Sequence, residues 1–380
     1  MRIGIDYTAA VLQGAGIGRY TRGLVSALIP LLSDHRLTLL YPRETAPAAA
    51  TDWPGNVDIR RLPLPDRWQT ILWHRLHLPF HVEFLTGPLD LFHAPNFLLP
   101  PVRSARTLVT IHDLAFLVRP QFAHPNLRRF LERTVPASIA RADHILADSE
   151  ASRRDAIRLF GLSPRQVTVV GAGVEPRFRP RAASELMATR AKYGLHFPFV
   201  LSVATLEPRK NFDGLIRAFV AARQRRRLPH HLVIGGGKGW LYENIFAEVE
   251  RQEAGDFVHF LGYVDDADLP DLYNLADLFA FPSHYEGFGL PVLEAMACGT
   301  AVLCTDTSSL PELAGDAAYM IPTGDEEALV EGLCRLLEDD TLRNELAARG
   351  PAQAAAWTWE AAARRLLRVY TAVAGRDLVD

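Results

Sequence analysis

Short apolar runs rich in β-branched residues alternate with longer amphipathic stretches along most of the chain. Strands buried on both faces have such continuous apolar sequences, and parallel strands need a long crossover, usually helical, between them. The alternation therefore predicts an α/β fold with parallel sheets built from β–α–β units. The expected strands are residues 2–6, 38–41, 89–93, 107–112, 144–147, 167–170, 199–203, 231–234, 258–261, 278–281 and 301–304.

This alternation is interrupted over residues 176–191, where prolines and arginines replace any strand pattern. At 380 residues, the chain has the length of about two domains. We expect a first Rossmann-like lobe over 1–178, a linker over 179–196 and a second Rossmann-like lobe over 197–358. A helix is expected over 359–380, and we consider its packing back on the first lobe.

Composition excludes several classes of protein. With 48% hydrophobic and 22% charged residues, the sequence is that of a globular chain and not a disordered one. No run approaches the roughly 18 apolar residues that span a bilayer, and Asp6 comes too early for the apolar core of a signal peptide. The three cysteines have no metal-ligand spacing, so we expect reduced thiols in a cytoplasmic protein.

The net charge of −3 hides an asymmetry between the two halves of the chain. Residues 1–190 carry 24 Lys and Arg against 16 Asp and Glu (+8), and residues 191–380 carry 17 against 28 (−11). The basic half suits an anionic lipid surface or phosphate; alternatively, the two lobes attract each other. Nucleic acid is not expected, because no basic segment carries interleaved stacking aromatics.

The segment at residues 279–299 is the most informative about chemistry. An apolar strand gives way to a glycine-rich loop, and Pro291 suits the first turn of the helix that follows. The backbone N–H groups near Gly289, Leu290 and Val292 would point out of this helix N-terminus, where they can hold phosphate.

Two carboxylates accompany this phosphate site. Glu286 lies in the loop before the helix, and Glu294 lies about one turn into it. Carboxylates repel phosphate, so the pair is better explained as acceptors for sugar or ribose hydroxyl groups. The alternative is a helix-capping glutamate and an unrelated surface glutamate.

This segment resembles the retaining, nucleotide-sugar-dependent glycosyltransferases of family GT4, which have the GT-B fold. Further motifs similar to those of the family lie at residues 14–20, 110–113, 147–153, 207–211 and 308–315, so the resemblance covers nearly the whole chain. It implies two Rossmann-like lobes whose parallel sheets face each other across a cleft. The first lobe would lie on the acceptor side, and the second would bind the nucleotide sugar.

Arg209 and Lys210 follow the first strand of the second lobe, at the carboxyl edge where α/β sheets bind ligands. Two cations there can neutralise a diphosphate and stabilise it more strongly as it leaves. The alternative is a solvated pair at a helix start, where cations are electrostatically unfavourable. The family often has glycine where Ala204 stands, and the extra methyl group narrows the approach to the donor.

The resemblance also assigns the other site residues. The catalytic group is His112, Arg209, Lys210 and Glu286, with His112 lining the sugar pocket. The donor-binding group is Gly16, Gly18, Phe288, Gly289, Leu290 and Glu294, with Glu294 on the ribose. The acceptor side is Arg19, Tyr20, His93 and Asn96. The alternatives are a plain tight turn for the glycines and structural roles for the histidines.

Asp266 and Asp268 imitate the Asp-x-Asp metal motif of a different glycosyltransferase fold. Because Asp268 directly precedes a Leu-Pro helix start, we interpret it as a helix cap. No divalent metal and no other cofactor is therefore expected, and the nucleotide sugar is a co-substrate.

The function that these features imply is transfer of a hexose, with retention, to a saccharide or lipid-linked saccharide acceptor in surface polysaccharide synthesis. The motif at residues 205–211 resembles mannosyltransferase-like members, so GDP-mannose is the first expected donor. The alternatives are a nucleotide-sugar 2-epimerase of the same architecture and a catalytically silent sugar-nucleotide-binding regulator. A peripheral position on the inner face of a membrane is expected if the acceptor is lipid-linked.

Overall fold

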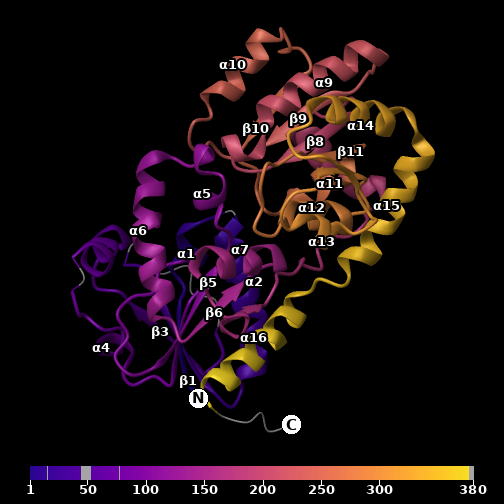
Figure 1. Cartoon of the computed structure of the whole chain (residues 1–380). Coiled ribbons are helices and arrows are strands. Elements are labelled where there is room, and N and C mark those ends of the chain that lie inside the picture. Colours follow the sequence, from indigo (N-terminus) through magenta and orange to yellow (C-terminus); the bar gives the residue numbers. More distant parts are fainter. Residues whose placement is uncertain (15, 44–52, 77, 376–380) are drawn as a thin grey trace. The chain divides into compact units, whose positions relative to one another are not determined.

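The computed structural model describes residues 1–14, 16–43, 53–76 and 78–375, and the chain forms two compact units (Figure 1). The first unit contains Met1–Val118, Pro125–Gly173 and the chain from Thr358 onward, and the second contains Arg119–His124 and Val174–Trp357. Each unit is a Rossmann-like α/β domain around one parallel sheet, as the apolar runs predict.

In the described chain, the sheet of the first unit has seven strands in the order β3-β2-β1-β4-β5-β6-β7. The strands are β1 (Arg2–Asp6), β2 (Arg36–Tyr41), β3 (Val57–Arg61), β4 (Leu91–Ala94), β5 (Arg106–Ile111), β6 (His144–Ala147) and β7 (Val167–Val169). The helices are α1 (Thr8–Leu12), α2 (Gly16–Leu28), α3 (Asp66–Thr70), α4 (Glu83–Thr86), α5 (Ala115–Val118), α6 (Pro125–Arg141), α7 (Glu150–Phe160) and α16 (Trp359–Val373). The strand order reverses between β1 and β4, and the carboxyl ends at such a point form the usual ligand site of an α/β sheet.

The second unit repeats this plan with six strands among its described residues, in the order β10-β9-β8-β11-β12-β13. The strands are β8 (Phe199–Val203), β9 (His231–Gly235), β10 (Val258–Gly262), β11 (Leu278–Phe281), β12 (Val302–Thr305) and β13 (Tyr319–Ile321). The helices are α8 (Met187–Lys192), α9 (Phe212–Arg226), α10 (Glu243–Arg251), α11 (Leu269–Leu275), α12 (Leu290–Ala297), α13 (Leu310–Ala314), α14 (Glu326–Glu338) and α15 (Asp340–Ala354). Its strand order reverses between β8 and β11.

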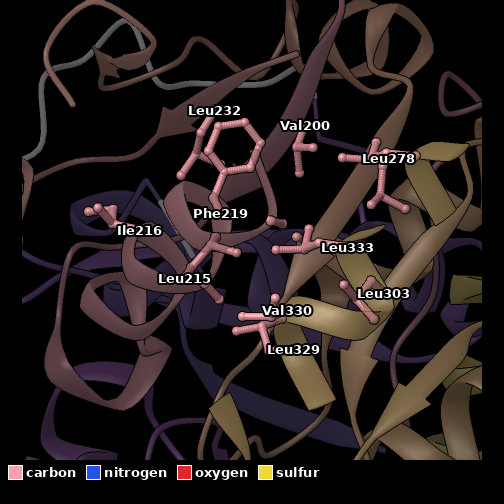
Figure 2. Close-up of a cluster of buried hydrophobic side chains, with 14 of the residues drawn as sticks. Val200, Leu215, Ile216, Phe219, Leu232, Leu278, Leu303, Leu329, Val330 and Leu333 are labelled. Carbon is pink, nitrogen blue, oxygen red and sulfur yellow. The ribbon is translucent and has the colours of Figure 1, made fainter. Parts of the chain in front are cut away.

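Helices α9 and α14 pack together over the sheet of the second unit (Figure 2). Leu215 and Phe219 of α9 meet Leu333 of α14 above Val200 and Leu303 from two strands, and all five side chains are fully buried. Each such side chain contributes about 1.5–3 kcal/mol by leaving water. This core gives the strand ends that carry the candidate site a rigid base.

Helix α16 packs against α2 within the first unit. The ring of Trp359 lies directly over Gly23, where a Cβ atom would come within 2.4 Å of the indole. Farther along the helix, the Tyr370 hydroxyl lies 2.7 Å from Nδ1 of the buried His93. The C-terminal helix therefore forms part of the core of the first unit.

Two strands were not expected from the sequence. Strand β3 lies at one edge of its sheet and ends in two exposed arginines, so it lacks a continuous apolar run. Strand β13 lies at an edge as well and has only three residues. The linker expected at 179–196 packs with the second unit, where Arg181 forms an ion pair with Asp271 at 2.5 Å.

No helix among the described residues has both the length and the apolar character needed to cross a bilayer.

Candidate active site

The candidate site of the second unit lies where its strand order reverses. Strand β8 leads into the single 3-10 turn Pro208–Lys210, and β11 leads into the loop that carries Glu286. The two segments are joined by a hydrogen bond of 2.8 Å from the His284 N–H to the Arg209 carbonyl. The topology thus brings Glu286 to Arg209 and Lys210, which lie more than seventy residues before it.

The three charged side chains form a compact ion cluster. Nζ of Lys210 lies 2.5 Å from Oε1 of Glu286, and Nη1 of Arg209 lies 3.3 Å from Oε2 of the same carboxylate. The exposed fractions of the side chains are only 11% for Lys210, 16% for Arg209 and 7% for Glu286. Interactions between charges so far removed from water are weakly screened. The two cations are therefore positioned before any ligand arrives.

The cluster keeps Glu286 ionised. Burial alone would raise the pKa of this carboxyl, but the charges of Lys210 and Arg209 outweigh burial, so the pKa lies below its usual value. An ionised carboxylate only accepts hydrogen bonds, which suits recognition of sugar hydroxyl groups. The arrangement thus offers cations for phosphate and an acceptor for hydroxyl groups side by side.

Glu207 completes the cluster, although no individual role was assigned to it from the sequence. Its side chain is 3% exposed, and Oε1 lies 2.6 Å from Nη2 of Arg209. Nη1 of Arg209 also donates to the Tyr285 carbonyl at 2.8 Å. These contacts fix the guanidinium in one orientation. A glutamate two residues before an arginine is too common a pattern to have revealed this.

The motif at residues 308–315 supports the loop that carries Glu286. The Glu286 N–H donates to Oγ of Ser308 at 2.7 Å, and Oγ of Ser309 donates to the Phe288 carbonyl at 2.8 Å. Ser308 has a positive φ of 47°, a conformation that non-glycine residues adopt at an energetic cost. The two serines thus hold the backbone on both sides of the Glu286 side chain.

Helix α12 begins as the sequence predicts, with Gly289 at its N-cap and Pro291 in its first turn. Gly289 has a φ of 109°, and a Cβ atom there would meet Leu310 at 2.7 Å, so both conformation and space require glycine. The expectation for the Val292 N–H is wrong, because this group donates to the Gly289 carbonyl at 3.0 Å instead of pointing outward. Of the three N–H groups expected to hold phosphate, those of Gly289 and Leu290 remain as candidates.

The other donor-side residues of this unit are enclosed. Phe288 is buried, with its ring edge-on to Trp357 at 5.3 Å between centroids. Glu294 is also buried and accepts a hydrogen bond of 3.1 Å from the Tyr273 hydroxyl. One oxygen of Glu294 is thus oriented by the Tyr273 hydroxyl.

In the first unit, the structure places His112 just beyond the end of β5 and holds both of its ring nitrogens. Nδ1 lies 2.7 Å from Oδ2 of Asp148, and Nε2 lies 2.7 Å from the Pro95 carbonyl. The ring of Tyr20 meets the imidazole edge-on at 4.9 Å. Asn96 follows Pro95 and is half-buried.

His93 lies in the core and not at the surface of its unit. It is 1% exposed, and its ring nitrogens contact the Tyr370 hydroxyl at 2.7 Å and Oγ1 of Thr110 at 2.8 Å. Burial, together with the neighbouring His112, lowers the pKa of His93 to about 3, so its ring is neutral. Its contacts are those of a structural residue.

The two candidate glycines in the glycine-rich loop of the first unit differ in their exposure and surroundings. Gly16 is exposed, with a positive φ of 38°. At Gly18, a Cβ atom would come within 1.8 Å of the Gln13 carbonyl, so close packing alone requires glycine there. Arg19 is half-buried and Tyr20 is buried.

The interpretation of the Asp268 side chain as a helix cap is wrong. The residue occupies the N-cap position of α11, but its side chain makes no capping hydrogen bond. Oδ2 instead lies 2.5 Å from Nζ of Lys192 and accepts from the Tyr193 hydroxyl at 2.8 Å. Two partners on another segment therefore compete successfully with the helix N-terminus.

Known proteins share both sequence and fold with this chain. Family models match two stretches, residues 14–178 by Glycosyltransferase Family 4 and residues 189–353 by Glycosyl transferases group 1. O-antigen chain mannosyltransferase B of Escherichia coli is 36% identical over 282 residues, which are 74% of each chain. The serotype-specific mannosyltransferase WbdA of the same organism is 32% identical over 272 residues, 70% of this chain but 33% of WbdA.

The sucrose-phosphate synthase of Thermosynechococcus elongatus superposes with a TM-score of 0.79 at 22% identity, covering 98% of this chain and 99% of that one. This structural similarity covers the fold of both units. The chain belongs to the GT-B glycosyltransferases of group 1, which are similar to family GT4.

Proposed function

We propose that this glycosyltransferase moves a mannosyl residue from GDP-mannose, with retention of configuration, to a saccharide or lipid-linked saccharide acceptor in surface polysaccharide synthesis. The observation that carries the proposal is the buried ion cluster of Arg209, Lys210 and Glu286 at the reversal point of the second sheet. The choice of mannose and of the acceptor class rests on the similarity to O-antigen mannosyltransferases.

In the proposed reaction, the bond from the anomeric carbon to the diphosphate oxygen breaks and the acceptor hydroxyl oxygen bonds to the same face of that carbon. The hydroxyl proton passes to the leaving phosphate. Arg209 and Lys210 bind the diphosphate and stabilise the charge that it gains. Glu286 accepts hydrogen bonds from the sugar, and Glu294 from the ribose.

The state of the carboxylates favours this same-face route over a covalent glycosyl intermediate. Glu286 is bound to two cations and has a lowered pKa, which makes it a poor nucleophile. Glu207 is bound to Arg209. A glycosidase-like pair would instead need one free carboxylate beside the anomeric carbon.

The proposal also excludes a required metal ion, since the two cations take its place at the diphosphate. Asp268, the residue that best imitates a metal ligand, is held by Lys192 and Tyr193.

The test is turnover of GDP-mannose, UDP-glucose and ADP-glucose with octyl α-mannoside as an acceptor probe. We expect GDP release and a mannosylated product whose new linkage has the α configuration of the donor by proton NMR. Isomerised donor without transfer would establish the epimerase, and donor-induced thermal stabilisation without turnover would establish the silent regulator. Product from UDP-glucose alone would overturn the choice of donor.

We further propose that the first unit attaches reversibly to anionic membrane from the inner face. Its short helices and the chain between them expose large apolar side chains, namely Trp68, Leu76, Leu78, Phe80 and Phe84, with exposed fractions of 40–64%. Such residues, flanked by basic ones, suit the interface of a bilayer. Of the arginines in α6 and α7, however, Arg128, Arg153 and Arg158 pair with acids on their own helices, which leaves less charge for lipid than the sequence suggests.

A further inference from the structure

The motif at residues 147–153 contacts His112 through two side chains. The reaction proposed above assigns no role to this motif. Oδ2 of Asp148 contacts Nδ1 of the imidazole at 2.7 Å. Oγ of Ser152 donates to the His112 carbonyl at 2.8 Å, and Oγ of Ser149 caps helix α7 through the Ser152 N–H. The motif therefore holds both the ring and the backbone of one residue.

The two partners of the His112 ring determine its protonation. A carboxylate oxygen and a backbone carbonyl oxygen, each 2.7 Å from a ring nitrogen, are both acceptors. With Asp148 ionised, each ring nitrogen carries a hydrogen, and only the imidazolium has both. Burial raises the pKa of Asp148, whereas the charge and hydrogen bond of His112 act to lower it. Asp148 supplies the compensating charge within the same buried site.

The bonds made by His112 connect three neighbouring strands. Pro95 follows β4, His112 follows β5 and Asp148 follows β6, and these strands are adjacent in the sheet. The turn at residues 95–97 contains Asn96 and ends at Phe97, which has a positive φ of 57°. A left-handed conformation is costly for an aromatic residue and persists only where its surroundings impose it.

The surroundings of this turn are His112 and strand β5. The Phe97 ring lies edge-on to the imidazole at 5.5 Å, and the Phe97 N–H donates to the Thr110 carbonyl at 3.0 Å. The Pro95 carbonyl is held from the other side by Nε2 of His112. Loss of the proton on either ring nitrogen would release one of the two strand ends.

We propose that His112 is a clamp, charged at neutral pH, that fixes the turn at residues 95–97 and with it Asn96 on the acceptor side. Asp148 is the positioning residue that keeps the clamp charged. His112 then acts on the acceptor side through the shape of this turn. The link to the acceptor rests on the proposed function, whereas the charge and the clamp do not.

The groups that face the imidazole agree with a charged ring. Burial alone would lower the pKa of His112, but the charge and hydrogen bond of Asp148, the Pro95 carbonyl and Asp113 together raise it above its ordinary value. His93 faces it from β4 and is neutral. Tyr20 faces it from α2, and burial keeps the pKa of this phenol well above its ordinary value. Arg365 of α16 adds positive charge near Tyr20.

The first experiment is a nitrogen-15 NMR titration of histidine-labelled wild-type protein, with the His112 signals assigned by their loss in His112→Gln. We expect both ring nitrogens of His112 to be protonated at pH 7, and a proton to be lost only on the alkaline side. An unprotonated nitrogen at pH 7 would overturn the proposal. This measurement needs no substrate, so its outcome is independent of the proposed donor and acceptor.

The second experiment compares Asp148→Asn with Asp143→Asn. Asp143 is the matched control because it joins the β5 and β6 ends at the opposite edge of the sheet, 2.7 Å from Arg106. Asp148→Asn should raise amide hydrogen exchange at Phe97 about tenfold or more, as expected for loss of a hydrogen bond to a charged group. It should also raise the KM for octyl α-mannoside by a similar factor without changing the KM for GDP-mannose.

Asp143→Asn should leave both quantities unchanged while lowering stability. The proposal fails if Phe97 exchange is unaffected by Asp148→Asn, or if Asp143→Asn changes it equally. If exchange rises as expected but neither donor nor acceptor is turned over, the clamp stands and the proposed function fails.

Discussion

Nζ of Lys210 and Oε1 of Glu286 lie 2.5 Å apart in a site that is almost closed to water. Replacing Lys210 by alanine removes one of the two cations that, in the proposed reaction, bind the leaving diphosphate. We expect turnover to fall about a hundredfold or more, the usual effect of losing one preorganised group at a developing anion. A fall of less than about threefold, or under roughly 1 kcal/mol, would remove Lys210 from the mechanism.

The matched control is Lys192→Ala. Lys192 also lies 2.5 Å from a carboxylate, that of Asp268, but its side chain is 52% exposed. We expect this variant to retain full turnover, since an exposed ion pair contributes little. Circular dichroism and thermal unfolding of both variants separate loss of chemistry from loss of fold.

The pH dependence of stability and activity follows from the lowered pKa of Glu286. A carboxyl group whose pKa is depressed by folding stabilises the protein above its unfolded pKa of about 4.3 and loses that contribution as the pH falls through the folded value. Wild-type kcat/KM should therefore show no titration of Glu286 between pH 5 and 8. In Lys210→Ala, burial is opposed by Arg209 alone, so the acidic limb should move to higher pH; an unmoved limb would contradict the coupling.

Metal independence is tested by removing metal. We expect turnover to survive dialysis against excess EDTA, because the side chains of Arg209 and Lys210 supply the positive charge. Asp268→Asn should weaken only the contacts to Lys192 and Tyr193. Loss of activity in EDTA with specific rescue by Mg²⁺ or Mn²⁺ would refute metal independence.

Attachment to lipid is tested by sedimentation with vesicles of phosphatidylcholine, with and without phosphatidylglycerol. We expect binding to the anionic vesicles to decrease with salt, because screening shortens electrostatic reach to about 8 Å at physiological ionic strength. The double variant Trp68→Ser/Phe84→Ser should bind less. Tyr263→Ser is the control, since Tyr263 is 60% exposed in the second unit; equal recovery with both kinds of vesicle would exclude the membrane proposal.

Gly23→Ala tests the packing of α16 on α2. Alanine inside a helix normally stabilises by about 0.5–1 kcal/mol relative to glycine. Here the added Cβ would lie 2.4 Å from the Trp359 ring, so we expect net destabilisation by about 1–3 kcal/mol. Urea unfolding measures the change, and Trp359→Leu in the same chain should relieve part of it. A Gly23→Ala protein as stable as the wild type would show that the contact adjusts freely.

The sequence predicted the central strands well because both faces of each are buried, which leaves continuous apolar runs. Strand β3 was not predicted, because an edge strand that ends in Arg60 and Arg61 has no such run. Local reasoning placed Gly289 and Pro291 correctly because their backbone requirements are intrinsic to glycine and proline.

The contacts among charged groups required the three-dimensional structure. The Asp268 side chain binds Lys192 instead of the helix N-terminus, and Lys192 lies on a segment more than seventy residues away. The role of Glu207 depends on the orientation of Arg209, and the burial of His93 depends on Tyr370 of the last helix. Sequence spacing contains no information about such distant partners.

The place of α16 has a consequence for the order in which the protein matures on the ribosome. The first unit is completed by Trp359 and Tyr370, which are synthesised after the whole second unit. After Gly173, about 180 further residues must be synthesised, at about 5–20 residues per second, before α16 can pack on α2, whereas domains ordinarily fold N-terminal first. The second unit can close its own core during that interval, so the later half of this chain is the part that can finish folding first.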